Sequence, residues 1–185
     1  MSRTGFGPMD IRMQIVRCRY EVHGDAVQQI FNFAIANTTA LYEYLPRDKQ
    51  RIAQWFAAKE QGNWPIIAAV DEQQQLLGFA SYGPFRGFPA NKYSVEHSVY
   101  VAPEHYGNGI ATRLMQHLLE LAQAQQFHAM VGAIDADNAA SIALHEKLGF
   151  RHSGTLPQVA FKFGRWLDLA FYQLLLPTPT VPTDD

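Results

Sequence analysis

The amino-acid sequence predicts an α/β (α+β) fold, in which a mixed sheet of about seven strands carries about four helices on its faces. Three observations lead to this prediction. Short segments alternate between apolar and polar residues, as strands do. Other segments repeat apolar residues at helical spacing. Finally, the strand and helix patterns follow one another in the order βαα, βββ, αβ, αββ.

The first half of the chain supplies three of the strands and two of the helices. Residues 13–19 alternate in polarity and predict a strand. A helix is expected to open near Asp25, because the apolar residues that follow share one face: Val27, Ile30, Phe31, Ala34 and Ile35. A second helix is predicted over 48–59. Residues 66–70 and 76–82 then predict a β-hairpin, and a loop rich in glycine and proline follows it.

The second half supplies the other elements. Residues 93–101 predict a strand in which Glu96 lies on the face opposite Val95 and Val99, because strand side chains alternate. An amphipathic helix is predicted over 110–125 and a strand over 128–134. A short helix over 139–148, which Asp137 or Asn138 could cap and Gly149 could end, precedes two last strands at 150–163 and 166–176.

The length of 185 residues predicts one domain, over residues 13–176. Residues 1–12 carry glycines and a proline and are expected to form a loose extension. Residues 177–185 are rich in proline and threonine and are expected to form a disordered tail.

Composition and charge restrict the function. A net charge of -2 gives no general attraction to nucleic acid or to an anionic membrane, so we expect a small partner. No apolar run approaches the roughly 20 residues of a spanning helix. The single cysteine, Cys18, excludes an intrachain disulfide and fits a cytoplasmic location. The histidines form no HxxxH or HExxH pattern, so no metal site is expected.

Two glycines mark the turn between the strand at 93–101 and the helix at 110–125, in the hexapeptide YGNGIA of residues 106–111. A helix N-terminus offers unpaired N–H groups and a partial positive charge, so a turn without side chains at this point suits an anionic phosphate. The same glycines can also serve only to allow positive φ, which is the commoner use. Taken alone, the turn leaves both interpretations open.

The sequence around this turn resembles the acetyl-CoA motif of the GNAT N-acetyltransferases, in which a strand leads to Q/R-x-x-G-x-G/A and then to a long helix. The resemblance is carried by VYVAPEHYGNGIATRLMQHLLELA at 99–122, where the first motif position, normally glutamine or arginine, is Tyr106. Farther along, NAASIALHEKLGF at 138–150 is similar to the second CoA motif of the family. The resemblance covers about 13–176 and implies a GNAT fold with a mostly antiparallel sheet.

Five blocks narrow the resemblance to the phosphinothricin and methionine sulfoximine acetyltransferase subgroup: NTTA at 37–40, GFASYGPFR at 78–86, VEHSVYV at 95–101, the second CoA motif, and KFGRWLDL at 162–169. The subgroup implies acetyl transfer from acetyl-CoA to the α-amino group of a small glutamate-like analogue, without a metal. It also implies a homodimer. Within KFGRW, Lys162 and Arg165 could add positive potential, but strand pairing and a possible dimer contact are the main interpretation.

The resemblance also implies roles for individual residues. Glu96 would be the catalytic base, and His145 would protonate the departing thiolate. The implied CoA-binding residues are Ser98, Val99, Tyr100, Tyr106, Gly107, Asn108, Gly109, Ile110, Ala111 and Asn138. Those implied for the amine substrate are Phe85, Arg86, Gly87, Val95, Glu96 and His97.

Elementary chemistry supports some of these roles and leaves alternatives. A carboxylate among apolar neighbours has a raised pKa, as a base requires, but Glu96 could also be an exposed or ion-paired sheet residue. His145 can donate a proton near neutral pH or be a packed or surface residue. The aliphatic neighbours of His97 favour a satisfied core histidine. The planar guanidinium of Arg86 could form a bidentate pair with a substrate carboxylate or phosphinate, although loop arginines are usually solvated. Asn138 could bind CoA, cap the short helix, or do both.

Three alternatives to this function stay open. The chain could acetylate another amine, such as a protein N-terminus or a polyamine. It could bind acetyl-CoA without catalysis, or it could be a structural protein whose glycines only turn the chain. Cys18 has no recognisable base nearby in the sequence, so direct attack by the amine is expected rather than an acetyl-cysteine intermediate.

Overall fold

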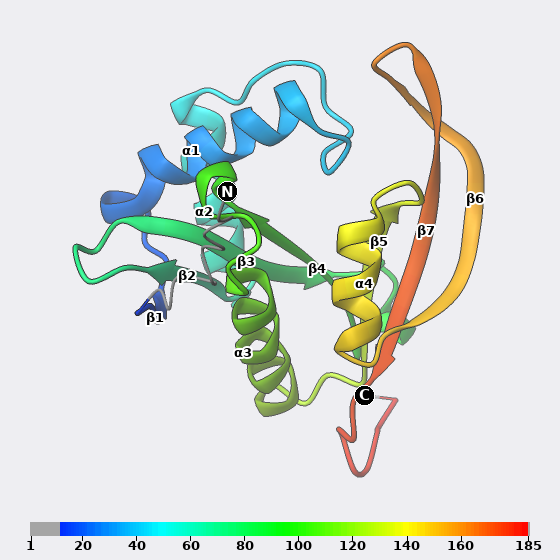
Figure 1. Ribbon diagram of the computed structural model, residues 1–185. Helices are drawn as coiled ribbons and strands as arrows, with labels where there is room; N and C mark the ends of the chain where they lie inside the picture. Colours follow the sequence, from blue (N-terminus) through cyan, green and yellow to red (C-terminus); the bar gives the residue numbers. More distant parts are fainter. Residues whose placement is uncertain (1–11, 185) are drawn as a thin grey trace, which may run out of the picture.

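The computed structural model describes residues 12–184 and contains one sheet of seven strands in the order β1-β2-β3-β4-β5-β7-β6 (Figure 1). Neighbouring strands are antiparallel except β4 and β5, which are parallel. The strands are β1 (Gln14–Arg17), β2 (Ile66–Val70), β3 (Leu76–Pro84), β4 (Ser94–Val101), β5 (Ala129–Asp135), β6 (Arg151–Lys162) and β7 (Arg165–Leu175). The α-helices of the described residues are α1 (Tyr20–Asn37), α2 (Lys49–Gln61), α3 (Ile110–Ala124) and α4 (Ala139–Lys147). The predicted mixed sheet with four helices is confirmed.

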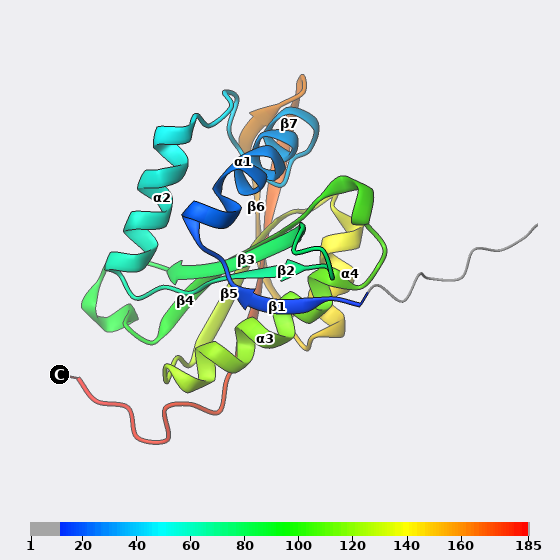
Figure 2. The same ribbon diagram turned by 90° about the vertical axis from the view of Figure 1, so that its left-hand side faces the viewer.

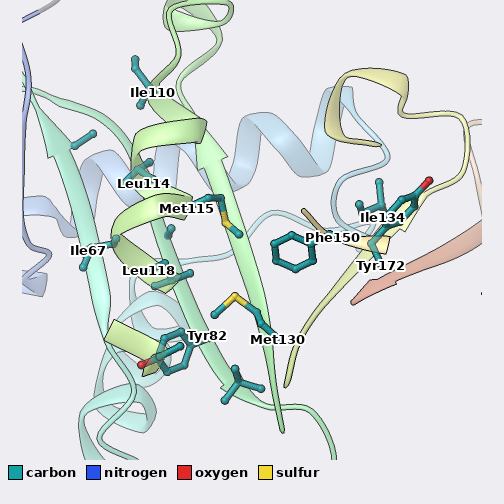
Figure 3. Close-up of a cluster of buried hydrophobic side chains, with 14 of the residues drawn as sticks. Ile67, Tyr82, Ile110, Leu114, Met115, Leu118, Met130, Ile134, Phe150 and Tyr172 are labelled. Carbon is teal, nitrogen blue, oxygen red and sulfur yellow. The ribbon is translucent and has the colours of Figure 1, made fainter. Parts of the chain in front are cut away.

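Helices cover both faces of the sheet, which is why β2 is buried along its whole length. Ile67 and Ala69 of β2 face the cluster that holds the apolar stripe of α3 (Figure 3). Their neighbours Ala68 and Val70 face the other cluster, with Phe31 of α1 and the apolar side chains of α2. Figure 2 shows α1 and α2 on one side of the sheet and α3 on the other.

Helix α1 begins at Tyr20, five residues before the predicted opening near Asp25. A contact joins the residue before the helix to its first turn: the backbone N–H of Arg19 donates to Nδ1 of His23 at 3.0 Å. The Tyr20 ring also packs over Gly24, where a Cβ would lie 2.8 Å from a ring carbon. The first turn is therefore held by residues that a search for an Asp or Ser cap does not find.

Strands β6 and β7 form a long hairpin that extends beyond the body of the sheet (Figure 1). Several of its large apolar side chains are exposed, and we call these five residues the hairpin patch: Leu156, Val159, Phe161, Phe163 and Trp166.

The two ends of the chain differ in what the structure describes. The extension predicted over residues 1–12 lies outside the described residues, apart from Arg12. Residues 177–184 form no helix or strand, yet Thr178 donates to the Phe127 carbonyl and the Thr183 N–H donates to the Tyr93 hydroxyl at 3.1 Å. None of the helices in the described part of the chain is long and apolar enough to cross a membrane.

Candidate active site

The parallel pair β4 and β5 separates partway along its length. Its pairing covers Ser94–Glu96 against 129–131, and beyond this point β5 is paired only on its other edge, with β7. A cavity of about 320 Å³ lies where the strands diverge. It is lined by residues 39–42 after α1, 96–100 of β4, 133–135 of β5, and Asn138, Ser141, His145 and Leu169. A larger cavity of about 830 Å³ lies by β1, α2 and α3, and none of the predicted site residues lines it.

Glu96 is the last residue of β4 that pairs with β5, and its side chain is half-buried at the edge of the cavity. Burial raises the pKa of its carboxyl, and the positive charge of Lys59 opposes that rise. The Lys59 ammonium donates to the Tyr82 carbonyl at 2.8 Å and lies close to Gly83, the cross-strand partner of Glu96. Burial lowers the pKa of Lys59 itself to about 8. Sequence patterns gave no signal for Lys59, because it approaches from α2.

The β4 backbone beyond Glu96 is paired on one side alone in the described chain. Ser98, Val99 and Tyr100 pair with β3, while the ladder to β5 has ended. Main-chain groups of this segment on the β5 side therefore face the cavity. Aligned N–H donors of this kind can steady a developing negative charge on oxygen.

His145 and His97 lie together in the core, although 48 residues separate them in the sequence. Their Nε2 atoms are 2.9 Å apart, and Nδ1 of His145 lies 2.6 Å from the Ser141 carbonyl oxygen. His97 was expected to be a satisfied core histidine. It is buried, but its Nδ1 has no hydrogen-bond partner among residues 12–184.

The glycine turn opens directly onto the start of α3. Gly107 has φ +80° and Gly109, the residue that caps α3, has φ +74°. No side chain caps this helix, and a Cβ built on either glycine meets no atom within 4 Å. The positive φ of both glycines confirms the backbone use. The open space before the helix is compatible with an anionic ligand, and phosphate binding stays a prediction. Ile110 is buried and anchors the helix start, while Tyr106 is exposed.

The N–H groups at the start of α3 therefore fit a phosphate group. Asn108 donates from its side chain to the His105 carbonyl at 3.3 Å, which helps to shape the turn. None of residues 106–111 lines the cavity, whereas Asn138 does. Asn138 caps α4 by accepting from the Ser141 N–H at 3.1 Å. Its side-chain amide nitrogen remains for a ligand, so the capping and binding roles of Asn138 are compatible.

The loop with Phe85, Arg86 and Gly87 lies outside the cavity lining. Arg86 is exposed, and its guanidinium lies 5.5 Å from the centre of the Phe88 ring. Val95 is buried in the core beside the site. The predicted roles of these residues in substrate binding stay predictions.

Two charged residues of the KFGRW block, Lys162 and Arg165, contact segments that line the cavity or lie next to its lining residues. The ammonium of Lys162 is buried and donates to the Thr38 and Leu41 carbonyls at 2.8 and 2.7 Å, which ties the loop after α1 to the β6–β7 hairpin. Arg165 pairs with Asp137 at 2.8 Å and with Asp135 at 3.5 Å. Neither contact was predicted, because each joins segments far apart in the sequence.

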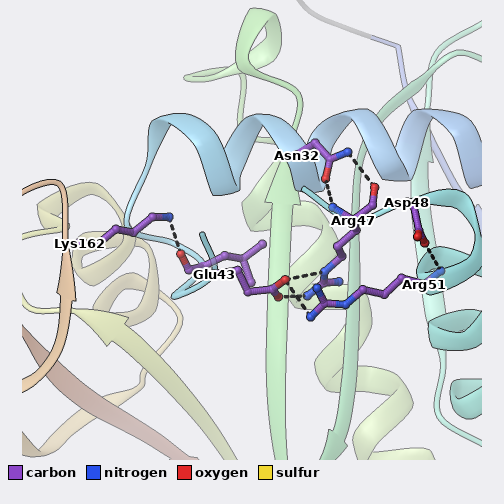
Figure 4. Close-up of polar contacts among 7 residues, drawn as sticks. Asn32, Glu43, Arg47, Asp48, Arg51 and Lys162 are labelled. Atoms are coloured by element: carbon purple, nitrogen blue, oxygen red, sulfur yellow. Dashed lines mark hydrogen bonds and ion pairs between the residues drawn. The ribbon is translucent and has the colours of Figure 1, made fainter. Parts of the chain in front are cut away.

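The same loop is also fixed to α1 and α2, as Figure 4 shows. Glu43 forms ion pairs with Arg47 and Arg51, and the Arg47 backbone exchanges hydrogen bonds with the Asn32 amide. Residues 39–42 therefore form a wall that is supported on both sides.

A comparison with known families matches residues 27–150 to the Acetyltransferase (GNAT) family. The chain therefore belongs to this family and is an acetyl-CoA-dependent N-acetyltransferase, which confirms the resemblance.

Its relatives include an L-methionine sulfoximine/L-methionine sulfone acetyltransferase of Pseudomonas paraeruginosa, 49% identical over 83% of this chain and 90% of the relative. A phosphinothricin N-acetyltransferase of Streptomyces coelicolor is 36% identical over 78% of this chain and 85% of the relative. The crystal structure of a phosphinothricin acetyltransferase from Sinorhizobium meliloti in complex with acetyl-CoA is 30% identical and has a TM-score of 0.87. That comparison covers 92% of each chain.

Proposed function

We propose that the protein transfers the acetyl group of acetyl-CoA to the α-amino group of a small amino acid analogue of the phosphinothricin or methionine sulfoximine type. The observation that carries this proposal is the position of Glu96, a half-buried carboxylate of raised pKa at the point where β4 and β5 part. The names of the relatives support the class of substrate.

Acetyl-CoA supplies the activated acetyl thioester. Its diphosphate would bind to the N–H groups of Gly107–Ala111 at the start of α3, with Tyr106 beside them. Its pantetheine arm would lie along Ser98, Val99 and Tyr100 of β4 and contact Asn138. The open space at the two glycines and the uncapped helix support this arrangement.

Glu96 would take a proton from the substrate ammonium, directly or through a water, and so produce the free amine that attacks the thioester. A β4 N–H near Val99 would steady the oxyanion. Direct attack is favoured over an acetyl-cysteine intermediate, because Cys18 is buried and burial raises its thiol pKa to about 12.

The experiment is steady-state thiol release from acetyl-CoA with methionine sulfoximine, methionine sulfone, phosphinothricin, ordinary amino acids, spermidine and a peptide N-terminus. We expect the first three to give the highest kcat/KM. A preference for the peptide or spermidine would assign another amine. An absence of turnover with every amine, together with measurable acetyl-CoA binding, would favour the non-catalytic module.

Glu96→Gln is the matched variant, because it keeps the shape of the side chain and removes the base. We expect kcat to fall by about 10²-fold or more, with little change in the Kd of acetyl-CoA measured by calorimetry. Glu120→Gln, which changes an exposed carboxylate of α3, serves as the control and should leave kcat unchanged. An unchanged kcat in Glu96→Gln would remove Glu96 from the mechanism.

We also propose that the protein forms a homodimer. The hairpin patch supports this proposal, because its five apolar side chains are 45% to 57% exposed and belong to one hairpin. Clustered apolar side chains on a surface mark interaction sites more often than scattered ones do.

A further inference from the structure

The histidine pair reaches across the gap between β4 and β5, at the cavity. His97 comes from β4 and His145 from α4, and both are at least nine-tenths buried. Their Nε2 atoms are 2.9 Å apart, whereas the ring centres are 4.9 Å apart and the ring planes differ by 21°. The rings therefore meet edge to edge, which is the geometry that an N–H···N hydrogen bond requires.

The close approach of the rings depends on Gly132 of β5. A Cβ at this position would lie 2.8 Å from Nε2 of His97 and 3.0 Å from Nε2 of His145. Any larger residue would therefore push into the hydrogen bond itself. The hydrogen bond between the imidazoles lies over residue 132 of β5. Glycine at this position leaves the space that the bond needs.

The hydrogens of the pair can be assigned from its partners. A carbonyl oxygen only accepts, so Nδ1 of His145 carries a hydrogen that it donates to Ser141. In neutral His145 the other nitrogen, Nε2, is then an acceptor. The hydrogen between the rings must come from Nε2 of His97, which leaves Nδ1 of His97 as a bare acceptor without a partner among the described residues.

Burial favours this neutral arrangement. It lowers the pKa of His97 to about 3, with the neighbouring His145 acting in the same direction, and it also lowers the pKa of His145. Tyr172 of β7 lies near the pair, with its ring centre 6.4 Å from that of His145. Four other titratable residues line the same cavity as the pair: Tyr42, Glu96, Tyr100 and Asp135. In the described chain, no carboxylate forms an ion pair with either imidazole.

We propose that His97 is a positioning residue that holds His145 neutral, with its Nε2 occupied, in the resting enzyme. This inference rests on the proposed function, in which His145 is the group that protonates the departing thiolate. A neutral pair has no proton to give, because donation would leave an imidazolate. The pair must therefore first take up the proton that the attacking amine loses, and then pass one proton to the thiolate sulfur.

The proton count then balances. Two N–H bonds of the substrate ammonium break: Glu96 takes the first proton and later gives it to solvent, and the histidine pair takes the second after the amine has attacked. The C–S bond of the thioester breaks, one S–H bond forms with the proton from the pair, and the imidazoles return to their starting state. Before that, His97 keeps His145 from taking up a proton from solvent, because a donor to the lone pair of a neutral imidazole disfavours its charged form.

The direct test is a ¹⁵N NMR titration of the histidine side chains in the full chain without ligand. We expect the Nδ1–H tautomer for His145 and the Nε2–H tautomer for His97, both neutral at pH 7. In His97→Leu the donor is lost, so the pKa of His145 should rise. In His97→Gln the side-chain amide can still donate to His145, so its pKa should stay close to that of the wild type.

Gly132→Ala tests the hydrogen bond without replacing either histidine. It keeps both imidazoles and places a methyl group against their Nε2 atoms, so the pKa of His145 should rise as in His97→Leu. His117→Gln is the control, because His117 lies on α3 and pairs with the exposed Glu120. It should leave the signals of both buried histidines unchanged.

The functional readout is the pH profile of kcat. We expect His97→Leu to lower kcat by up to about a hundredfold with little change in acetyl-CoA KM, since misplacing a catalytic group by about 1 Å has effects of this size. The limb on which kcat falls with decreasing pH should move to higher pH, because the resting pair must be neutral to take up a proton, and His97→Gln should restore much of the loss.

Two results of the NMR titration would overturn the proposal: an Nε2–H tautomer for wild-type His145, or an equal His145 pKa in wild type, His97→Leu and His97→Gln. An active wild type whose His97→Leu variant keeps the same kcat and pH profile would also overturn it. An inactive wild type would instead contradict the proposed function, while the NMR titration would still decide the state of the histidine pair.

Discussion

At the scale of single residues, the charge of Lys59 opposes the effect of burial on the pKa of Glu96. Burial raises the pKa of Glu96 and Lys59 lowers it, so loss of the ammonium leaves a carboxyl of still higher pKa. A base must be ionised, so kcat/KM decreases as the pH falls through the pKa of Glu96. In Lys59→Met this decrease should therefore occur at higher pH than in the wild type.

The measurement is the pH profile of kcat/KM for the amine. Lys59→Arg keeps the positive charge and should keep the wild-type profile, and Lys49→Met removes an exposed lysine paired with Asp25 as a control. If Lys59→Met follows the wild-type profile, Lys59 has no electrostatic role at Glu96.

The residues of the site differ in how far the sequence reveals them. Glu96 could be placed on a strand face by alternation, and Gly109 by its position before an amphipathic helix. The contact of His97 with His145 and the tether from Lys162 could not be predicted, because each depends on how distant elements pack. Composition and spacing describe neighbours along the chain, whereas these contacts arise from tertiary structure.

At the scale of elements, the turn before α3 requires positive φ in its backbone, and in the proposed function it also binds the diphosphate of acetyl-CoA. Gly109→Ala would place a methyl group at φ +74°, a conformation that costs about 1–2 kcal/mol for a residue with a Cβ. The same methyl group would cover the N–H groups that approach the diphosphate. We therefore expect a modest decrease in Tm and an increase of about tenfold in the Kd of acetyl-CoA, measured by calorimetry.

Gly164 provides a matched control for this variant. It has φ +74° as well, and a Cβ built on it also meets no atom within 4 Å, but it lies in the β6–β7 turn. Gly164→Ala should decrease Tm by a similar amount and leave the Kd unchanged. Equal effects of the two variants on the Kd would show that strain alone, and not access to the helix start, explains the loss.

The loop after α1 depends on Lys162 of β6. Lys162→Met leaves the Thr38 and Leu41 carbonyls without their donor, which we expect to cost about 1–3 kcal/mol of unfolding free energy. Since residues 39–42 line the cavity, the KM of the amine should rise while the Kd of acetyl-CoA stays constant. Thermal unfolding and steady-state kinetics would check this, and an unchanged amine KM would show that the loop does not need this tether.

The helices and strands were largely predictable, because the spacing of apolar residues along each segment reflects which of its faces is buried. The predicted hairpin strand at 76–82 extends to Pro84, and the strand predicted over 13–19 is shorter, at Gln14–Arg17. The start of α1 differs most, because its first turn is fixed by the Arg19 N–H, which donates to the His23 ring, and not by an Asp or Ser cap. Ends of elements are set by such single contacts, which periodicity does not report.

At the scale of the whole molecule, the parallel pair determines where the site forms. Six strand pairs build the sheet, and the parallel one, β4 with β5, has the shortest register of three residue pairs. Helices α1 and α2 cover one face of the sheet, and α3 covers the other. The strands can part without opening the core, because the histidine pair and the loop after α1 fill the space around the cavity.

The hairpin patch gives the last prediction, which concerns the assembly. Wild-type protein should have twice the mass of one chain in light scattering after size exclusion, because the exposed Val159 and Trp166 are most easily covered by a second copy. The double variant Val159→Glu/Trp166→Glu places like charges in that contact and should have the mass of one chain. Val22→Glu changes an apolar residue of α1 that is 68% exposed and should remain dimeric. A wild type that stays monomeric at high concentration, or a double variant that stays dimeric, would show that the patch does not join two copies.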